Sequence, residues 1–333
     1  ANIGVATGPS PIGPFTDPLG RDLINHRTPG VQPARNMWLF DPGVFIDDNG
    51  QAYIYFGGNG DDNVRVARLN RDMISLDGEV MKMTATNFFE AAWVFKRNGV
   101  YYFSYSTTPR AGMRFDYMTS DNPTNGFTYR GIVSDQPPIN NNNHHAVIFE
   151  FKGRWYHVCH NRIVAKQAGI PTGFRRNLAV EELNFNEDGT IKKVTYTTNG
   201  VVQLGRLDPF TRVEGETFNA QSGVETEPCG EGGMNLTDLN HGDWVSIVGV
   251  DFGTKGAGKF SARVASAGQG GNIELRLGGP DGKLIGACKV ENTEGWQKWK
   301  TVSCEVSGAS GARDLCLKFT GGDGSLFNLD YWR

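Results

Sequence analysis

The sequence predicts an all-β protein with two domains, a β-propeller over residues 1–211 and a β-sandwich over residues 212–333. Its 333 residues exceed the usual length of one domain. Its 44 glycines and 11% aromatic residues, without a long helical periodicity, are typical of many short strands joined by tight turns. A segment also recurs at an interval of about 50 residues, as the blades of a propeller do.

The composition limits the class of function. The net charge of −3 gives no basic surface for nucleic acid. No apolar run approaches the roughly 20 residues that cross a bilayer, so we expect no membrane insertion. The chain opens at Ala1 without Met or an apolar leader, which predicts either a processed mature form or a fragment.

Three segments define the repeat, and each begins with a polar residue. They are Asp41-PGVFIDDNGQAYIYF, Glu90-AAWVFKRNGVYYFSY and His144-HAVIFEFKGRWYHVC. In each, Gly follows nine residues after the first residue, and Tyr follows three residues later. Because Asn-Gly pairs favour tight hairpin turns, each segment predicts two strands joined by a turn. The innermost strand of every blade lines the axis, so Asp41, Glu90 and His144 or His145 are expected to meet.

Two carboxyl groups in an aromatic-rich setting indicate acid–base chemistry, and glycoside hydrolysis often uses such a pair. Glu90 lies between Phe88-Phe89 and Trp93, an apolar setting that favours a protonated general acid. Asp41 is expected to stay ionised, and the residues alone leave open whether it is a base or a nucleophile. Each of these residues also has a purely structural explanation, as a turn former, a solvated edge or a partner of backbone carbonyls.

At these residues the chain resembles glycoside hydrolase family 43 over about Ala1 to Leu207. The motifs are MWLFDPGVFIDDNG, FFEAAWVFKRNGVYYFSYS, FDYMTSDNPTNGFTYRG and the Asn140 to Val147 segment. The resemblance implies a five-bladed propeller and, within the family, is strongest to the arabinoxylan arabinofuranohydrolases. It implies an inverting mechanism in which Glu90 is the general acid and Asp41 orients and tunes it.

The same resemblance implies further contacts. Trp38 would stack on the sugar chain and Arg162 would contact the bound sugar. His144 and His145 would organise the centre of the propeller, near a bound calcium. Family members carry their base, an Asp, on the first blade, and this chain begins near the end of the second. We therefore expect that an N-terminal segment of roughly 100 residues supplies the base and completes the propeller, and that this segment has been lost or is a separate chain. The alternative is a short, inactive or rearranged protein.

The second domain predicts a β-sandwich because short alternating strands are separated by Gly-rich turns from Val213 onward. It resembles carbohydrate-binding module family 6 through VEGE, NHGDW and FNLDYW. That resemblance implies a structural calcium held by Glu214, Glu216 and Asp330, and oxygen-only coordination suits Ca²⁺. The alternative is a solvated edge with no metal.

The usual sugar cleft of that family holds a ring between two aromatic side chains beside an Asn. Trp296 and Asn328 match, whereas the second aromatic position is Asp238. The five cysteines show no zinc spacing, and the sequence leaves open whether those of the second domain form one or two disulfides or stay as free thiols.

The function that follows is the release of α-L-arabinofuranosyl side chains from arabinoxylan, by a protein that acts outside the cell. A β-xylosidase of the same family is the near alternative. A non-catalytic carbohydrate-binding protein is a third, because the base is expected outside this chain. A structural propeller for protein partners is a weaker fourth.

Overall fold

The computed structural model describes the chain except residues 10–12, 110–111, 141–143 and 199, so part of the Asn140 to Val147 motif lies outside the described residues. It divides into two compact units, Ala1–Val202 and Gln203–Arg333. Strands dominate both units, with one short helix, α1 (Ile163–Gln167), and one 3-10 turn, η1 (Asp61–Asn63), in the described part. The predicted all-β class is confirmed. The described residues contain no helix with the length and hydrophobicity of a membrane span.

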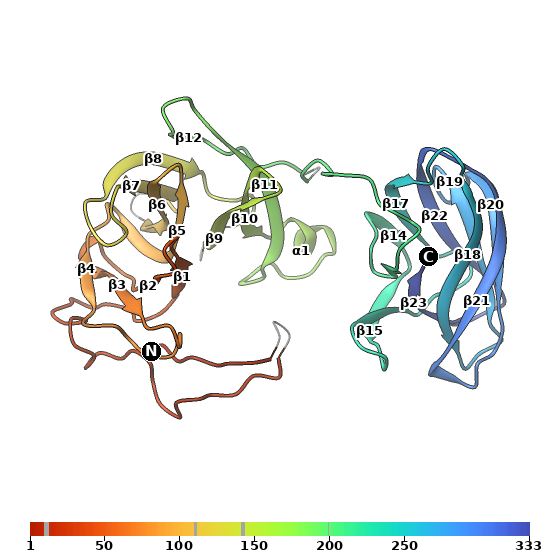
Figure 1. Ribbon diagram of the computed structural model, residues 1–333, viewed down its shortest axis with the longest axis horizontal. Coiled ribbons are helices and arrows are strands. Elements are labelled where there is room, and N and C mark those ends of the chain that lie inside the picture. The colour runs from red at the N-terminus through yellow and green to blue at the C-terminus, as the bar shows by residue number, and fades with distance from the viewer. Residues whose placement is uncertain (10–12, 110–111, 141–143, 199) are drawn as a thin grey trace. The chain divides into compact units, whose positions relative to one another are not determined.

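The first unit contains three four-stranded antiparallel sheets, each built from strands consecutive in the chain, as in propeller blades (Figure 1). The first sheet, orange in Figure 1, holds β1 (Gly43–Ile46), β2 (Ala52–Phe56), β3 (Val64–Leu69) and β4 (Met81–Met83). The second holds β5 (Phe88–Arg97), β6 (Val100–Thr107), β7 (Phe115–Ser120) and β8 (Thr128–Ser134). The third, green, holds β9 (Ala146–Phe151), β10 (Arg154–Asn161), β11 (Asn177–Phe185) and β12 (Ile191–Lys192).

The predicted repeat corresponds to the first hairpin of each sheet. β1 pairs with β2, β5 with β6 and β9 with β10, all antiparallel. In the second and third hairpins both turn residues have positive φ, at Asn98-Gly99 and Lys152-Gly153. This is the geometry that matches the twist of the flanking strands. The hairpin prediction is confirmed for all three segments.

The first strands of successive sheets lie next to one another, because β1 contacts β5 and β5 contacts β9. Between the sheets lie two buried clusters, each rich in aromatic side chains. Phe88, Phe103 and Tyr105 form part of the first, and Phe95 and Tyr102 form part of the second. Removing these rings from water holds the sheets together and so brings the starts of β1, β5 and β9 to one place.

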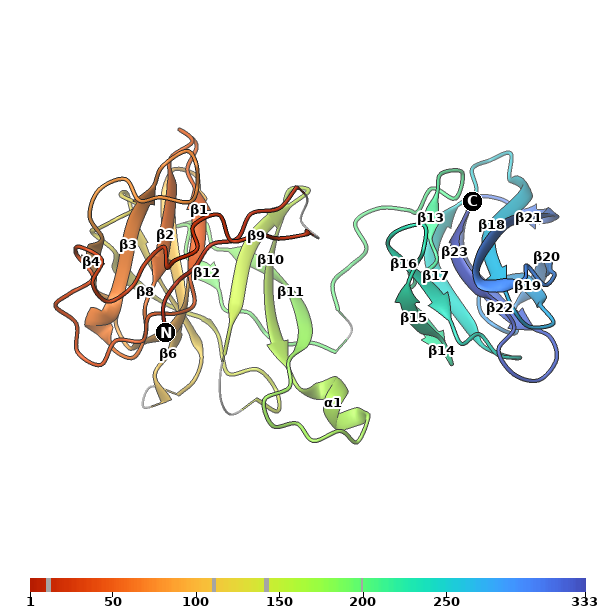
Figure 2. The same cartoon turned by 90° about the horizontal axis from the view of Figure 1, so that it is seen from below.

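The second unit is a sandwich of two antiparallel sheets around one apolar core, as predicted (Figure 2). One sheet holds β13 (Val213–Glu214), β15 (Glu225–Pro228), β16 (Met234–Thr237), β18 (Ala257–Ser266), β21 (Gly295–Ala309) and β23 (Asn328–Trp332). The other holds β14 (Ala220–Ser222), β17 (Trp244–Asp251), β19 (Gly271–Leu277), β20 (Lys283–Val290) and β22 (Ala312–Thr320).

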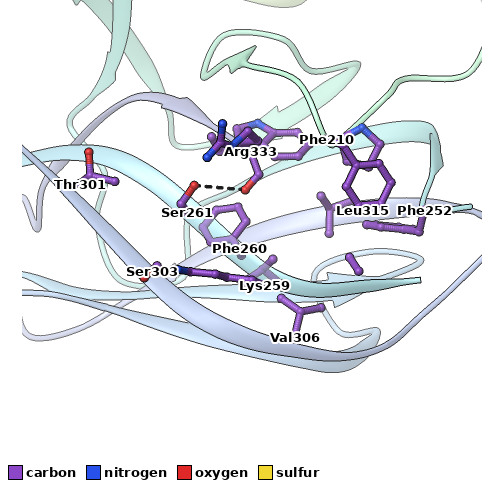
Figure 3. Close-up of a pocket in the computed structure, with 14 residues that line it drawn as sticks. Phe210, Phe252, Lys259, Phe260, Ser261, Thr301, Ser303, Val306, Leu315 and Arg333 are labelled. Carbon is purple, nitrogen blue, oxygen red and sulfur yellow. Dashed lines mark hydrogen bonds between the residues drawn. The ribbon is translucent and has the colours of Figure 1, made fainter. Parts of the chain in front are cut away.

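Residues 203–211, predicted to end the first domain, pack on the second unit. The backbone N–H of Leu207 donates to the carbonyl of Gly249 at 3.0 Å, and that of Asp251 donates to Leu207 at 2.8 Å. Phe210 lines a cavity of about 350 Å³ at one end of the sandwich core, beside Phe252 (Figure 3). The domain boundary at 211/212 stays a prediction. The contacts described here join residues 203–211 to the sandwich.

Candidate active site

Asp41, Glu90 and His145 converge at the starts of the three inner strands. His145 Nε2 lies 3.3 Å from Asp41 Oδ2 and 3.5 Å from Glu90 Oε1. One ligand-type atom from each of the three residues lies within 4.8 Å of the other two. The structure therefore brings together the two predicted carboxyl groups and one of the two predicted histidines.

The backbone is distorted where it presents these carboxyl groups. Asp41 and Ala91 both have positive φ, 51° and 61°, a backbone conformation that residues other than glycine rarely adopt. The pairing of β5 with β6 shifts register on both sides of Glu90. Bulges of this kind redirect a side chain and often occur beside active sites. Gly43 is required for the close approach of β1 and β5, because a Cβ there would clash with the carbonyl oxygen of Ala92.

Burial controls the charge of Asp41. Loss of solvent raises the pKa of its carboxyl above the usual range, His145 opposes this effect, and the negative charge of Glu90 adds to it. Asp41 Oδ2 has no donor in hydrogen-bonding geometry among the described residues, although the His145 ring is close.

The two adjacent histidines have different positions. The ring of His144 is fully buried and lies against Phe115, with centroids 3.9 Å apart, so it has no open face for a sugar. Its backbone N–H donates to Glu90 Oε1 at 3.2 Å. Burial lowers the pKa of its ring to about 2, which keeps the ring neutral. His144 thus contacts Glu90 through its backbone, and His145 lies beside Glu90 through its ring.

Two more histidines, His157 and His160, lie on β10 behind the site. Burial lowers the pKa of each to about 4. His160 Nε2 accepts a hydrogen bond from the backbone N–H of His145 at 3.4 Å, and His157 Nε2 lies 3.2 Å from Ser134 Oγ. Sequence reasoning missed both residues. The available signal was their spacing in the second strand of the third hairpin, HVCH.

The two predicted sugar contacts of the first unit, Trp38 and Arg162, differ in exposure. Trp38 is 44% exposed, and its ring lies edge-on to Phe40 and Phe89, with centroids 5.4 Å away in each case. Arg162 is buried and lines a cavity of about 480 Å³ together with Asn140. Its Nε donates to a backbone carbonyl at 3.2 Å, so its direction is set by the protein itself.

In the second unit, Trp296 is 39% exposed while Asn328 beneath it is buried. The Asn328 amide donates to Glu227 Oε1 at 2.7 Å and to the carbonyl of Trp296 at 2.9 Å. Gln297 Nε2 donates to the same Glu227 oxygen at 2.9 Å. Sequence reasoning missed Glu227 and Gln297, which complete a polar group beside the exposed ring.

The three predicted calcium ligands lie in different surroundings. Among the residues that the structure describes, both carboxylate oxygens of Asp330 and Oε2 of Glu216 are buried without a hydrogen bond, as sites for a cation often are, although Arg212 Nη2 lies 3.6 Å from Asp330 Oδ2. Glu214 instead forms hydrogen bonds of 2.8 and 2.9 Å with Arg212. Among the described residues, the side chains that bring three possible metal-ligand atoms within 4.8 Å of one another are those of Asp41, Glu90 and His145. The predicted calcium ligands do not form such a group.

Comparisons with known proteins agree with this geometry. Residues 1–191 match the model of glycosyl hydrolases family 43, and residues 214–333 match carbohydrate binding module (family 6). The chain is 42% identical to an arabinoxylan arabinofuranohydrolase of Paenibacillus polymyxa, over 100% of this chain and 56% of that protein. It is 40% identical to an arabinoxylan arabinofuranohydrolase of Bacillus subtilis (strain 168), over 99% of this chain and 70% of that one.

Solved structures give the same result. A family 43 arabinoxylan arabinofuranohydrolase from Bacillus subtilis, in complex with cellotetraose, superposes with a TM-score of 0.91 at 39% identity, over 100% of this chain and 74% of that one. An α-L-arabinofuranosidase from Clostridium thermocellum is 55% identical over 61% of this chain and 68% of that one, with a TM-score of 0.55. The chain thus spans little more than half of the first relative's length. It belongs to glycosyl hydrolases family 43 and carries a family 6 carbohydrate binding module.

Proposed function

We propose that the protein hydrolyses α-L-arabinofuranosyl side chains from arabinoxylan with inversion at the anomeric carbon. The convergence of Glu90, Asp41 and His145 at the axis carries this proposal. The two relatives at 40–42% identity, both named as arabinoxylan arabinofuranohydrolases, support the choice of substrate.

In this mechanism protonated Glu90 gives its proton to the glycosidic oxygen as the bond to the arabinose carbon breaks. A water molecule attacks that carbon from the opposite face and loses a proton to a base. An inverting base and acid stand roughly 6.5–9.5 Å apart, which leaves room for the water. Asp41 lies within 4.8 Å of Glu90, too near for that role. Asp41 is therefore assigned to orienting Glu90.

The same spacing supports one rival mechanism. Carboxyl groups about 5 Å apart are typical of retaining enzymes, in which the second carboxylate is the nucleophile. Proton NMR of the first arabinose released distinguishes the two. Initial release of the inverted anomer agrees with the tuning role of Asp41, and the retained anomer would make Asp41 the nucleophile.

We infer that the base of the inverting reaction is an Asp on a segment outside these 333 residues. Its support is the short distance from Asp41 to Glu90 and the greater length of both relatives. The test measures arabinose release by the chain alone and after addition of the part of the Bacillus subtilis relative that the chain does not cover. Activity of the chain alone, equal to that of the mixture, would overturn this inference.

The role of Glu90 is tested in the active protein by Glu90→Gln. We expect a loss of at least about 10³-fold on arabinoxylan, because the amide has no proton to give. Glu150→Gln, an exposed position on β9, is the matched control and should keep full activity. Chromatography of the released sugar separates arabinose from xylose, and xylose as the main product would favour the β-xylosidase alternative.

The second unit is proposed to bind a polysaccharide chain through Trp296 and the polar group beneath it. An exposed aromatic ring stacks on the apolar face of a pyranose, and buried amides set its orientation. If the second unit folds alone, Trp296→Ala should remove its binding of xylo-oligosaccharides in calorimetry. If it does not, the same measurement is made on the full chain carrying Trp38→Ala, with and without Trp296→Ala. Binding of unchanged strength would contradict the proposal.

We also propose that Ca²⁺ stabilises this unit through Asp330 and Glu216, whose buried oxygens suit the ion. Glu214 would join only by leaving Arg212. On the propeller axis, His144 offers imidazole nitrogens, which suit Ca²⁺ less well, so the sandwich is the favoured place. Chelator should lower the unfolding temperature of the second unit in wild type and have no effect in Asp330→Asn.

Because arabinoxylan is too large to enter a cell, we further propose an extracellular location. Detection of the protein only inside cells would contradict this proposal.

A further inference from the structure

An aromatic platform made of Trp38, Phe40 and Phe89 includes the residue that precedes Glu90 in the chain. Phe89 immediately precedes Glu90 on β5, whereas Trp38 and Phe40 come from the segment before β1. The Trp38 ring meets both phenylalanines edge-on at 5.4 Å. The position of this platform relative to Glu90 thus depends on how two segments, about 50 residues apart in the chain, are joined.

The loop of residues 57–60 makes that connection through backbone hydrogen bonds on both sides. Toward the Trp38 segment, Trp38 N–H donates to Gly58 O at 3.3 Å and Gly57 N–H donates to Phe40 O at 3.2 Å. Toward β5, Asn59 N–H donates to Phe89 O at 2.8 Å, and Gly60 N–H donates to Phe88 O at 3.2 Å. The loop is therefore the spacer between the platform and the strand that carries the acid.

Gly58 leaves no room for a side chain at the centre of this spacer. A Cβ at this position would clash with the Phe40 ring and would lie 2.8 Å from the carbonyl oxygen of Phe89. Both neighbours belong to the platform. A single methyl group there must move a platform ring or the strand beside Glu90.

Asn63 holds the spacer from beneath with a buried amide. Its Nδ2 donates to the carbonyls of Arg35 at 3.0 Å, Gly58 at 3.2 Å and Asn59 at 3.0 Å. One nitrogen thus joins the chain before Trp38 to both central residues of the loop. Asn59 adds a second tie, since its own Nδ2 donates to the carbonyl of Asn36 at 2.9 Å.

We propose that Asn63, acting through Gly58 and Asn59, is a positioning residue that sets the platform at the distance from Glu90 needed to hold a neutral chain of pyranose rings. This inference rests on the proposed function, because it takes the platform as the site where the polysaccharide backbone stacks. The ligand class follows from the site: an exposed indole binds the apolar face of a sugar ring without requiring charge.

The test measures binding of xylo-oligosaccharides by calorimetry and by quenching of tryptophan fluorescence. The full 333-residue chain is used with Trp296→Ala, so that the exposed ring of the second unit does not contribute. Added to this background, Asn63→Ala, Asn59→Ala and Gly58→Ala should each weaken binding by roughly 5- to 20-fold, as expected for lost hydrogen bonds or a displaced ring. Asn63→Gln, which keeps the amide donor, should recover part of the affinity lost in Asn63→Ala.

Asn70→Ala is the matched control. The Asn70 amide also donates locally, to Ser75 Oγ at 2.9 Å and the carbonyl of Leu76 at 3.0 Å, but it lies outside the platform loop. Its binding should stay within about twofold of the background. If Asn63→Ala does not fold, the exposed Asn59 amide and Gly58 decide the question. Folded Asn59→Ala and Gly58→Ala variants that bind with unchanged affinity would overturn the proposal.

Trp38→Ala separates failure of this inference from failure of the proposed function. If Trp38→Ala loses binding while Asn63→Ala, Asn59→Ala and Gly58→Ala bind normally, the positioning role is overturned and the platform remains the binding site. Unchanged binding in Trp38→Ala overturns both the platform and the positioning role. Neither result affects the role of Glu90, which is measured separately by arabinose release from the Glu90→Gln protein.

Discussion

At the scale of single residues, three kinds of contact hold Glu90. A backbone N–H from His144 binds one oxygen, the His145 ring lies 3.5 Å from the same oxygen, and the Asp41 carboxyl stands within 4.8 Å. Burial and the charge of Glu90 both raise the pKa of Asp41, while His145 opposes them. The raised pKa favours the protonated form of the Asp41 carboxyl.

Asp41→Asn in the active protein tests that arrangement. The substitution removes a titratable carboxyl that lies within 4.8 Å of Glu90, so the pH profile of kcat/KM should change. We expect kcat to fall by about 10²- to 10⁴-fold, the usual contribution of a tuned acid–base group, with oligosaccharide affinity within about twofold of wild type. An unchanged pH profile would show that Asp41 does not tune the acid.

The same three side chains predict inhibition by Zn²⁺. Two carboxylates and an imidazole within 4.8 Å match the ligand types that Zn²⁺ prefers, and binding would ionise the acid. Calorimetry should show a Zn²⁺ site on the wild-type chain that weakens by at least about tenfold in His145→Gln. His26→Gln, an exposed control, should bind Zn²⁺ like wild type. Equal affinity in all three proteins would contradict a site at these residues.

At the scale of elements, β20 and β21 bring two of the five cysteines together. The structure has all five as free thiols, so no disulfide is present in it. The thiols of Cys288 on β20 and Cys304 on β21 nevertheless lie close enough to influence each other, and burial raises the pKa of Cys288 to about 12. These strands belong to opposite sheets of the sandwich, so a bond between them would join the two layers.

Treatment with a diazene oxidant should therefore convert these two thiols to one disulfide while the oxidant is reduced to a hydrazine. Closing the loop between them would stabilise the second unit by up to about 3 kcal/mol on the chain-entropy model. Peptide mapping should find the Cys288–Cys304 link, and calorimetry a higher unfolding temperature that Cys304→Ser abolishes. A link to Cys316 instead would contradict the predicted pairing.

At the scale of the whole molecule, the two units should respond differently to acid. Five of the six histidines lie in the first unit, and burial holds the pKa of His144, His157 and His160 well below that of the unfolded chain. Such groups stabilise the fold above pH 6.5, and this stability is lost as the pH falls through their pKa values in the folded protein. In the second unit without bound metal, burial raises the pKa of Asp330, so protonation of this carboxyl does not destabilise the unit as the pH falls.

Calorimetric scans between pH 7 and pH 4 test this difference. The shift of His157 from 6.5 to about 4 alone corresponds to a loss of up to about 3 kcal/mol by pH 4. The transition of the first unit should move to lower temperature more steeply than that of the second. His157→Gln should flatten the pH dependence of the first unit, and parallel shifts of both transitions would contradict the assignment.

The fold and the centre of the site were predictable from local patterns. Asn98-Gly99 and the matching turns predict hairpins because only a few residues favour positive φ. The 50-residue repeat then places Asp41, Glu90 and a histidine on equivalent strands. His157, His160, Glu227 and Gln297 were not predictable in the same way, because each lies in its site through contacts between strands that are distant in the chain.

The sequence by itself determined the all-β class, the hairpins, the family and the meeting of Asp41 with Glu90, since each depends on spacing along the chain. Only the tertiary structure decided that His145 faces the carboxyl groups while His144 turns its ring into the core. It also placed a carboxylate oxygen of Asp41 within 4.8 Å of one of Glu90. Those outcomes depend on bulges in β5 and on packing between sheets, which shift side chains by a few ångströms without changing the repeat.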